Sequence, residues 1–342
     1  MAVVLVTGGR GTIGSNVCLA LARQGKKCIS ADVSETESPM IEIAEDSVKS
    51  RIVFEKLDAT DFPRLCEIMK DYGVTGVING AHVPPRADWN IRDYIFPAIK
   101  VGMIGLINLL ELAREHHLPM VHFSSGSVYK ERLDFENPMK ENEPRSGNTL
   151  NHYYLQKFMQ DLLIEYYQKV HNTDVRIARP SRVYGPPRGK FGANKLPPDL
   201  ILPKVVQGET IIELPYAYQK SSEGTLRTPK ILTELTYVRD VAEAAIKLYD
   251  IERADLKQSV YNIGGGRLYS IEEIIETTRK LFPDRTIEFK MGQETEFTRN
   301  IRPPVDISAA RRDLNYEPTS LESAFNEYAA WLKTFYQKQN KK

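Results

Sequence analysis

The chain has 342 residues, 42% of them hydrophobic, which is enough for two domains or for one large domain with a lobe. Its 46 basic and 45 acidic side chains nearly cancel, so the net charge predicts neither a nucleic-acid nor a membrane partner. The three scattered cysteines (Cys18, Cys28 and Cys66) show neither disulfide nor metal-site spacing, and no signal peptide or uninterrupted apolar span is apparent. These features favour a cytoplasmic enzyme with reduced thiols and no metal.

Short apolar or β-branched runs alternate with helical patterns through the first half of the chain. They predict strands at Val3–Thr7, Cys28–Ala31, Ile52–Lys56, Gly76–Asn79, Met120–Ser124 and Val175–Arg179. Such alternation is typical of βαβ units. We therefore expect an α/β fold with a Rossmann-type, doubly wound parallel sheet.

The composition changes after Pro180, where prolines and glycines crowd residues 186–198. Helical patterns follow at 238–249, 270–281 and 321–336, the last with an apolar stripe. We expect an NAD-binding domain over residues 1–180, to which 231–262 return. A smaller C-terminal α/β lobe, residues 181–342, is expected to bind the substrate.

The first predicted strand runs into the sequence TGGRGTIG, which places Gly8, Gly11 and Gly14 three residues apart. Between a strand and a helix, such glycines let the backbone approach a pyrophosphate at the helix N-terminus. Asp32 ends the second strand about twenty residues on, where a carboxylate binds the adenosine ribose hydroxyls and repels a 2′-phosphate. The pattern favours NAD over NADP.

Two residues near this turn have alternative interpretations. Arg10 is either a solvated turn residue or a cation that reaches a phosphate. Asp58, after the third strand, either accepts a hydrogen bond from the adenine amine or caps the next helix.

The sequence NHYYLQKF carries a tyrosine–lysine pair at helical spacing. Tyr153 stands four residues before Lys157 and Tyr154 three, so either phenol can share a helix face with the lysine. A nearby cation lowers a phenol pKa, which allows the tyrosine to move the proton of a secondary alcohol during hydride transfer. The sequence FSSGSVY, at the end of a predicted strand, offers serines that can orient the alcohol oxygen.

At these motifs the chain resembles the extended short-chain dehydrogenase/reductases, also called NAD-dependent epimerase/dehydratases, among them UDP-glucose 4-epimerase. TGGRGTIG, FSSGSVY, YYLQK, ARPSRVYGP, LTYVRDVAEA and YNIGGG follow the family's motifs in order along nearly the whole chain. The resemblance implies catalytic roles for Ser125, Tyr153 and Lys157, with Tyr154 in packing and Ser124 and Ser127 as alternatives to Ser125. It implies cofactor contacts from Gly8, Gly11, Thr12, Ile13, Gly14, Asp32, Asp58, Ala59, Ala81, Tyr153 and Lys157.

The chain departs from the family pattern at positions that bear on the substrate. The family's central asparagine falls on Gly102, so its role is lost or supplied by a neighbour such as Lys100. Arg182 replaces the asparagine that contacts a diphosphate in members acting on nucleotide sugars, and Thr233 replaces a frequent arginine.

The segment NGAHVPPR also differs from the family's usual run, and it brings His82 and Arg86 into the expected substrate pocket beside Ser125, Ser127 and Arg182. The ordinary alternative for His82 is a packed or solvated histidine. Arg299 and Arg302 either hold a diphosphate or are surface charges.

The resemblance disfavours a dehydratase, which usually carries Asp-Glu after its serine or threonine, because Gly126 and Ser127 stand there instead. Three other functions follow from it. The first hypothesis is a nucleotide-sugar 4-epimerase that oxidises C4 transiently. The second is an NAD-dependent dehydrogenase of a non-nucleotide sugar, a sugar acid or another secondary alcohol. A non-catalytic NAD-binding regulator is the third, against which the intact serine, tyrosine and lysine argue.

Two apolar helices suggest a homodimer. In the family the equivalent helices pair as a four-helix bundle, although burial within one chain explains part of the same pattern. The residues that suggest it are Met103, Ile107, Leu110, Phe158, Leu162 and Tyr166. The sequence identifies neither the sugar nor any nucleotide on it.

Overall fold

The structure is a computed structural model of the chain. It describes residues 2–83, 91–129, 136–145, 152–187, 196–214, 219–220, 226–227, 232–291 and 303–340.

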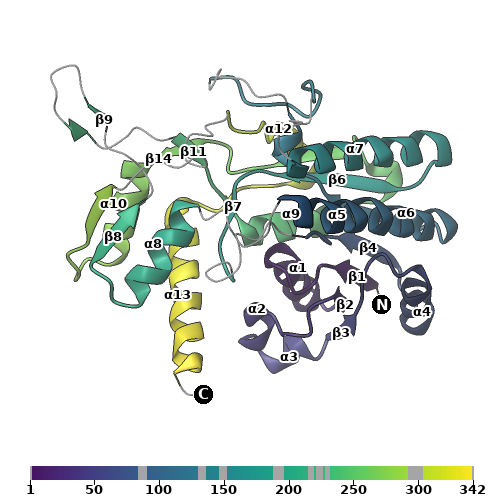
Figure 1. Ribbon diagram of the computed structural model, residues 1–342, viewed down its shortest axis with the longest axis horizontal. Helices are drawn as coiled ribbons and strands as arrows, with labels where there is room; N and C mark the ends of the chain where they lie inside the picture. The colour runs from purple at the N-terminus through teal and green to yellow at the C-terminus, as the bar shows by residue number, and fades with distance from the viewer. Residues whose placement is uncertain are drawn as a thin grey trace.

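The centre of the molecule is a seven-stranded parallel sheet (Figure 1). In chain order its strands are β1 (Val3–Thr7), β2 (Lys27–Asp32), β3 (Ile52–Lys56), β4 (Gly76–Asn79), β5 (Met120–Phe123), β6 (Val175–Pro180) and β13 (Val260–Ile263). Their spatial order is β13-β6-β5-β4-β1-β2-β3. The six predicted strands are confirmed to within one residue at each end, and so is the doubly wound fold.

The order of the strands reverses between β1 and β4. The chain leaves β1 toward β2 and β3 on one side, and it returns to build β4, β5 and β6 on the other. Connections that diverge in this way leave a crevice at the carboxyl ends of the strands, and ligands of open α/β sheets bind there. The fold alone therefore directs attention to the residues that follow β1 and β4.

Helices cover both faces of the sheet. In chain order the helices before residue 260 are α1 (Thr12–Arg23), α2 (Pro39–Glu42), α3 (Asp46–Lys49), α4 (Phe62–Tyr72), α5 (Ile91–Ile99), the π-helical η1 (Lys100–Gly105), α6 (Leu106–Glu115), η2 (Gly126–Val128), α7 (His152–His171), α8 (Pro197–Val206), α9 (Val238–Asp250) and η4 (Arg253–Asp255). Those after it are α10 (Ile271–Leu281), α12 (Ser308–Leu314) and α13 (Leu321–Gln339). Helix α1 begins at Thr12, directly after its N-cap Gly11.

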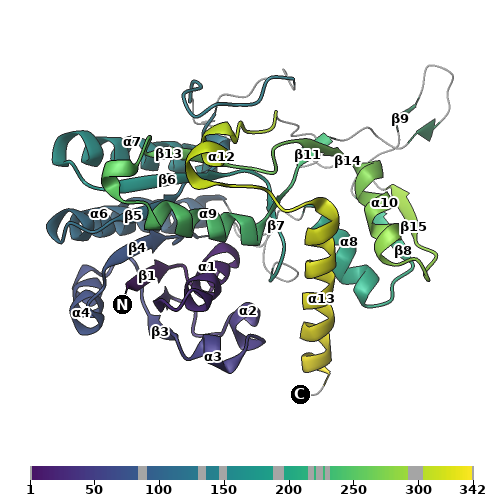
Figure 2. The ribbon, with the colours of Figure 1, turned by 180° about the vertical axis from the view of Figure 1, so that it is seen from behind.

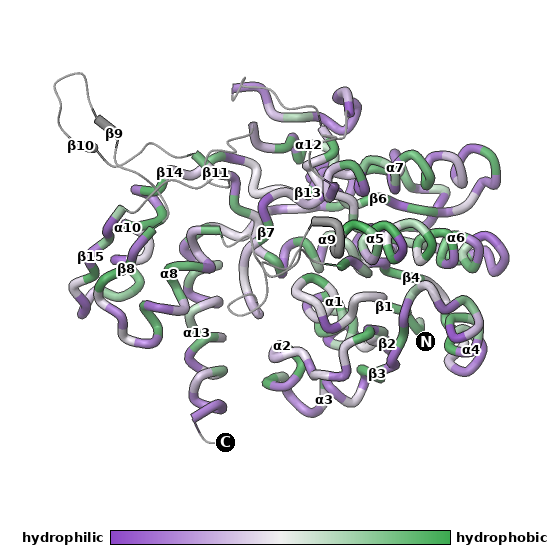
Figure 3. The backbone as a smooth tube through the Cα atoms, viewed as in Figure 1, coloured by the Kyte–Doolittle hydropathy of each residue, from purple (hydrophilic) through white to green (hydrophobic). Residues whose placement is uncertain are grey.

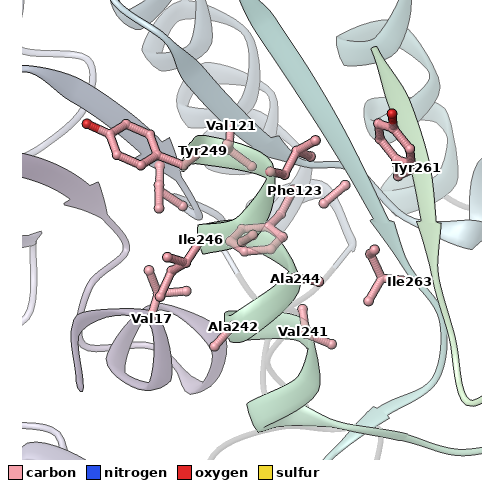
Figure 4. Packing of buried hydrophobic residues seen from close by; sticks show 14 of the residues in the cluster. Val17, Val121, Phe123, Val241, Ala242, Ala244, Ile246, Tyr249, Tyr261 and Ile263 are labelled. Atoms are coloured by element: carbon pink, nitrogen blue, oxygen red, sulfur yellow. The ribbon is translucent and has the colours of Figure 1, made fainter. Parts of the chain in front are cut away.

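Alternate side chains of the strands enter two separate cores, as the pleat of a strand requires. Val4 and Val6 pack with α1, α9 and α12, whereas Leu5 packs with α4, α6 and α7. Figure 4 shows the first core, where Val241 and Ile246 of α9 lie between Val17 of α1 and the sheet. The chain after residue 230 thus supplies both a strand and a covering helix to the sheet.

A second group of elements lies beyond one end of these layers, as Figures 1 and 2 show from opposite sides. Its core joins α8, α10 and α13, with Ile201, Ile274, Phe325 and Tyr328 all fully buried. The stripe predicted on the last helix is the face of α13 that is buried. Its short strands are β7 (Val183–Tyr184), β8 (Ile211–Leu214), β9 (Gln219–Lys220), β10 (Leu226–Arg227), β11 (Leu232–Glu234), β12 (Thr236–Tyr237), β14 (Leu268–Ser270) and β15 (Glu288–Met291).

One described helical stretch, Ile95–Glu115, is long and apolar enough to cross a membrane by length and composition. It was not expected from the sequence, because charged residues interrupt its apolar run. Of its most apolar window, 39% is buried inside the protein. Core helices of water-soluble proteins pass the same test.

A buried ion pair fixes α7 to the sheet. The guanidinium of Arg179 on β6 donates to Asp161 Oδ2 from Nε (3.1 Å) and Nη2 (2.8 Å), and both side chains are at most 1% exposed. Arg179 Nη1 also donates to the Tyr129 hydroxyl at 3.0 Å, which in turn donates to Asn262 on β13. The pair thus joins α7, β6 and β13.

We predict that Asp161→Ala lowers the free energy of unfolding by about 3–5 kcal/mol, because it leaves the Arg179 cation buried without its main counter-charge. Urea denaturation followed by circular dichroism measures the change. The matched control is Glu67→Ala, which breaks an Arg64 pair whose side chains are 35% and 61% exposed. That change should cost under about 1 kcal/mol. Equal losses in the two variants would contradict the prediction.

Candidate active site

Glycines in the turn between β1 and α1, and in the first turn of α1, leave no room for side chains. Gly8 has φ +67°, and a Cβ there would lie 2.5 Å from the carbonyl oxygen of Gly80. A Cβ on Gly14 would lie 2.1 Å from the carbonyl oxygen of Gly8. Gly11 is the N-cap of α1, and the first N–H groups of a helix have no partner within it. The turn therefore offers close backbone and free donors to an anion such as a pyrophosphate.

Asp32 lies beside this turn at the end of β2. Its Oδ2 accepts from the backbone N–H of Arg10 (3.1 Å), and its Oδ1 accepts from that of Ser34 (3.0 Å). The Arg10 side chain is only 7% exposed, and its guanidinium lies 3.3 Å from the centre of the Phe54 ring. The expectation of a solvated Arg10 is therefore wrong, because an aromatic ring of β3 covers it. A phosphate contact from Arg10 stays a prediction.

Asp58 and Ala59 follow β3. Asp58 is exposed, and its Oδ1 accepts from the backbone N–H and the hydroxyl of Thr60, both at 2.9 Å. The alternative in which Asp58 caps the next helix is wrong, because Asp61 accepts from the N–H of Arg64 in α4. Ala59 is buried, and its carbonyl accepts from Asn108 Nδ2 at 3.0 Å.

Helix α7 brings Tyr153 and Lys157 to the carboxyl ends of β4 and β5. Lys157 Nζ donates to the carbonyl of Phe123, the last residue of β5, at 2.7 Å. The ring of Tyr153 meets that of His82, three residues after β4, edge-on with a centroid distance of 5.2 Å. Burial lowers the pKa of Lys157 to about 8, against the opposing charge of Asp161. At neutral pH the Lys157 side chain is therefore mostly an ammonium ion.

Tyr154 is also half-buried, and its ring lies 6.0 Å from that of Tyr153 at 64°. The contact with His82 belongs to Tyr153. Tyr153 as the acid/base and Tyr154 as a packing residue stay predictions.

Two serine hydroxyls meet directly after β5. Ser125 Oγ accepts from the backbone N–H of Ser127 at 3.1 Å and from Ser127 Oγ at 2.9 Å. Ser124 and Ser127 are buried, whereas Ser125 is partly exposed. Of the three candidates, Ser125 is therefore the one that a ligand reaches most easily.

His82 occupies the expected pocket wall beside Tyr153. Burial, together with the charges of Lys157 and His152, lowers the pKa of His82 to about 3, so the imidazole is neutral at physiological pH. Its Nδ1 is buried and has no hydrogen-bond partner among the described residues. Ala81 precedes it, and its N–H donates to Asn79 Oδ1 at 3.1 Å. Arg86, Arg299 and Arg302 lie outside the described residues.

Arg182 and Thr233 lie on neighbouring segments, because β7 pairs with β12. Arg182 has φ +49°, and its carbonyl accepts from the N–H of Thr236 at 3.1 Å. The side chain of Arg182 is partly buried. The backbone of Arg182 thus lies beside the segment that follows Thr233.

Glu234 is a residue that the sequence analysis missed. It is 2% exposed, and its Oε2 accepts from the N–H of Val305 at 3.3 Å. Burial raises the pKa of Glu234 to about 7, although hydrogen bonds from Ser181, Val305 and Gly266 and the charge of Arg182 oppose the rise. A single acid inside the apolar run ILTELTYV was the signal that could have identified it.

Gln156 occupies the space beside Gly102. A Cβ at residue 102 would lie 1.7 Å from Gln156 Nε2. Lys100, the neighbour expected to compensate for the missing asparagine, is exposed. The sequence analysis did not single out Gln156, because a glutamine before the lysine carries no recognisable motif.

A model described as the NAD dependent epimerase/dehydratase family matches residues 4–264 of the chain. Among curated proteins, the chain is 25% identical to protein CapI from Staphylococcus aureus, over 98% of this chain and 99% of that protein. It is also 25% identical to a putative UDP-glucose 4-epimerase from Methanocaldococcus jannaschii, over 80% of each protein.

Solved structures share the fold over their whole length. UDP-glucose-4-epimerase from Stenotrophomonas maltophila, with bound NAD and formylated UDP-arabinopyranose, has a TM-score of 0.77 at 19% identity and covers 99% of this chain and 100% of its own. The Thermotoga maritima enzyme with UDP-glucose has a TM-score of 0.76 at 20% identity, covering 99% of both chains.

We predict that Glu234 makes stability fall as pH rises. A carboxyl whose pKa is raised by folding contributes its full stability below the unfolded pKa, near 4.3, and loses it as pH rises through about 7. Between these two pH values the wild-type protein should lose roughly 3 kcal/mol of its free energy of unfolding. Glu234→Gln keeps a neutral side chain at every pH and should avoid this loss.

Urea denaturation at pH 5 and pH 8 measures this difference. Glu276→Gln removes the same charge from an exposed position of α10 and should keep the wild-type pH dependence. An unchanged pH dependence in Glu234→Gln would contradict the prediction.

Proposed function

The chain belongs to the NAD-dependent epimerase/dehydratase family, and from this premise we propose that it is a nucleotide-sugar 4-epimerase. Tyr153 is the acid/base, Lys157 lowers its pKa, and Ser125 orients the reacting oxygen. The observation that carries the proposal is the hydrogen bond from Lys157 Nζ to the carbonyl of Phe123. Lys157 is one helical turn from Tyr153, and Phe123 is two residues before Ser125.

The residues around the crevice fit a dinucleotide. Gly8, Gly11, Thr12, Ile13 and Gly14 hold the pyrophosphate, and Asp32 binds the adenosine ribose. The close approach of the backbone at Gly8 and Gly14 supports this role. The remaining cofactor contacts come from Asp58, Ala59, Ala81, Tyr153 and Lys157.

The reaction needs one base and one electron acceptor. Tyr153, as phenolate, accepts the proton of the C4 hydroxyl while the C4 hydrogen leaves as hydride. Bound NAD would supply the hydride acceptor and donor for this chemistry, held by the cofactor residues named above. The 4-keto sugar turns over before the hydride returns, and Tyr153 gives its proton back to the oxygen. The hydroxyl of Ser125 donates to the same oxygen in both states.

Gly126 and Ser127 stand where a dehydratase of this family usually carries its additional acid and base. Neither residue can protonate a leaving hydroxyl at neutral pH. Loss of water from the intermediate is therefore disfavoured, and return of the hydride completes an epimerisation.

Several residues are proposed to bind the substrate. Arg182 binds the anionic diphosphate, for which a guanidinium offers paired donors. His82, Arg86, Ser125 and Ser127 contact the sugar. The neutral imidazole of His82, with its unpartnered Nδ1, is suited to a sugar hydroxyl.

A dehydrogenase of a non-nucleotide sugar or another secondary alcohol is the second candidate. Thr233 supplies no cation where the family often has an arginine, and Arg182 alone can bind a simple carboxylate. The relatives named UDP-glucose 4-epimerases favour the first candidate.

The domain division belongs to the same proposal. Residues 1–180, joined by 231–262, hold the cofactor, and 181–342 form the substrate lobe. In support, β13 pairs with β6, while α8, α10 and α13 share a separate core.

A homodimer is proposed from an exposed apolar surface on the helical run α5–η1–α6 and on α7. Figure 3 shows that α5 and α6 are hydrophobic along most of their length. This surface, which we call the outer helix face, consists of Ile95, Phe96, Ile104, Ile107, Leu162, Tyr166 and Val170, with exposed fractions from 38% to 74%. Pairing with a second copy would remove these side chains from water.

The nucleotide hypothesis is tested by thermal denaturation of NAD-saturated protein with UDP, dTDP, GDP or CDP in excess. We predict that one nucleotide stabilises the protein by about 2.7 kcal/mol at a hundred times its dissociation constant. Arg182→Gly keeps the left-handed backbone and should lose this stabilisation. If no nucleotide raises the midpoint, the nucleotide-sugar proposal fails.

We predict that the double variant Phe96→Glu/Tyr166→Glu halves the particle mass in light scattering, because charges on the outer helix face cannot be buried in a dimer. Val33→Glu is the control, since Val33 is 62% exposed on another part of the surface. A wild-type protein with the mass of one 38.9-kDa chain would refute the dimer.

A further inference from the structure

The helical run from Ile91 to Glu115 changes its hydrogen-bonding pattern in the middle. Residues 100–105 form the π-helical η1 between α5 and α6. A π turn inserts an extra residue and disturbs the regular pairing of carbonyls with N–H groups. Two carbonyls of this region accept from side chains of α7: Ala98 from Gln156 Nε2 at 2.9 Å, and Gly102 from Gln160 Nε2 at 2.8 Å.

These two glutamines are buried in an unusual way. Each is 1% exposed, and the Oε1 atom of Gln156 has no hydrogen-bond partner among the described residues. Burying a half-satisfied amide costs free energy. An apolar side chain would fill the same space without that cost, so the donor to the carbonyl is the feature that distinguishes glutamine here.

Steric fit makes the contact specific. Gln156 Nε2 lies where a Cβ of residue 102 would be, 1.7 Å from its ideal position, and Gln156 Cδ lies 2.7 Å from it. Only glycine at residue 102 admits the amide, and the amide fills the space that glycine leaves.

The same helical run also touches Ala59, which belongs to the proposed adenosine site. A Cβ on Gly105 would lie 3.0 Å from Ala59 Cβ, and Asn108 Nδ2 donates to the Ala59 carbonyl at 3.0 Å. The run therefore lies between the Asp58–Ala59 loop and the helix that carries Tyr153 and Lys157.

We propose that Gln156 and Gln160 are positioning residues that lock η1 to α7, and so fix Tyr153 and Lys157 relative to the cofactor site. The inference rests on the proposed role of Tyr153 as acid/base. Gln156 precedes Lys157 directly, and the 2.7 Å contact of Lys157 with Phe123 tolerates little movement of α7. Loss of the lock moves the ammonium away from the phenol, which weakens its effect on the phenol.

The test uses Gln156→Met, which keeps a similar volume and removes the donor. The ionisation of Tyr153 is measured by ultraviolet difference titration, as each protein minus the same protein carrying Tyr153→Phe. We expect Gln156→Met and Gln160→Met to raise the apparent pKa of Tyr153 by about one pH unit.

The matched control is Gln168→Met on the same helix. Gln168 Nε2 also donates to a backbone carbonyl, that of Val175, at 2.6 Å, but it lies far along α7 from η1. Gln168→Met should leave the Tyr153 titration unchanged even where it lowers the melting temperature. If Gln156→Met lowers the melting temperature but leaves the Tyr153 titration at the wild-type value, the inference is overturned.

A second set of variants tests the route through Gly102. Gly102→Ala should shift the titration as Gln156→Met does, because the new Cβ displaces the amide. In a protein that already carries Gln156→Ala, Gly102→Ala should shift the apparent pKa of Tyr153 little further, since the two residues act through one contact. Full additivity of the two shifts would overturn the route.

Failure of the proposed function has a different signature. If Tyr153→Phe retains turnover of the nucleotide sugar identified by thermal denaturation, then Tyr153 is not the acid/base, and the inference falls with it. An inactive Tyr153→Phe with a titration that no glutamine variant moves overturns the inference alone.

Discussion

The buried ammonium of Lys157 is the constraint on which the rest of the site depends. A charge that is 5% exposed needs compensation, because desolvation of an unpaired ion costs several kcal/mol. The structure supplies the Phe123 carbonyl at 2.7 Å, with Asp161 one turn further along α7. Asp161 is itself held by Arg179 of β6. Helix α7 is therefore held to the sheet by two contacts of charged side chains, Lys157 with Phe123 and Asp161 with Arg179. These contacts determine where Tyr153 lies.

The glycine turn after β1 and the proposed catalytic residues lie at the same edge of the sheet, because the strand order reverses between β1 and β4. Gly8 follows β1 and approaches the carbonyl of Gly80, which follows β4, so closely that a Cβ on Gly8 would clash with it. Ala81 and His82 continue from that contact toward Tyr153. Backbone packing at these glycines thus joins the turn after β1 to the segment that leads to Tyr153.

Most of the fold could be predicted from the sequence, because short apolar runs and glycine turns depend on residues that are close together in the chain. Val3–Thr7, Gly8 and the Tyr153–Lys157 spacing are of this kind. Features that arise from contacts distant in sequence could not be predicted. Arg10 is covered by Phe54, and Glu234 is buried by segments from residues 181, 266 and 305. Gln156 meets Gly102 only because two helices pack at a π turn. None of these pairings leaves a periodic signal.

The hydrogen bonds between Ser125 and Ser127, directly after β5, determine whether Ser125 acts as a hydrogen-bond donor or acceptor. A hydroxyl has one hydrogen and two lone pairs. Ser125 Oγ accepts from both the N–H and the hydroxyl of Ser127, so its lone pairs are occupied and its hydrogen is free for an outside acceptor. Chained hydroxyls polarise one another, which strengthens that donor. The Ser125 hydroxyl can therefore donate to the oxygen of an alcohol or of a ketone, whereas it has no free lone pair to accept from an ammonium group.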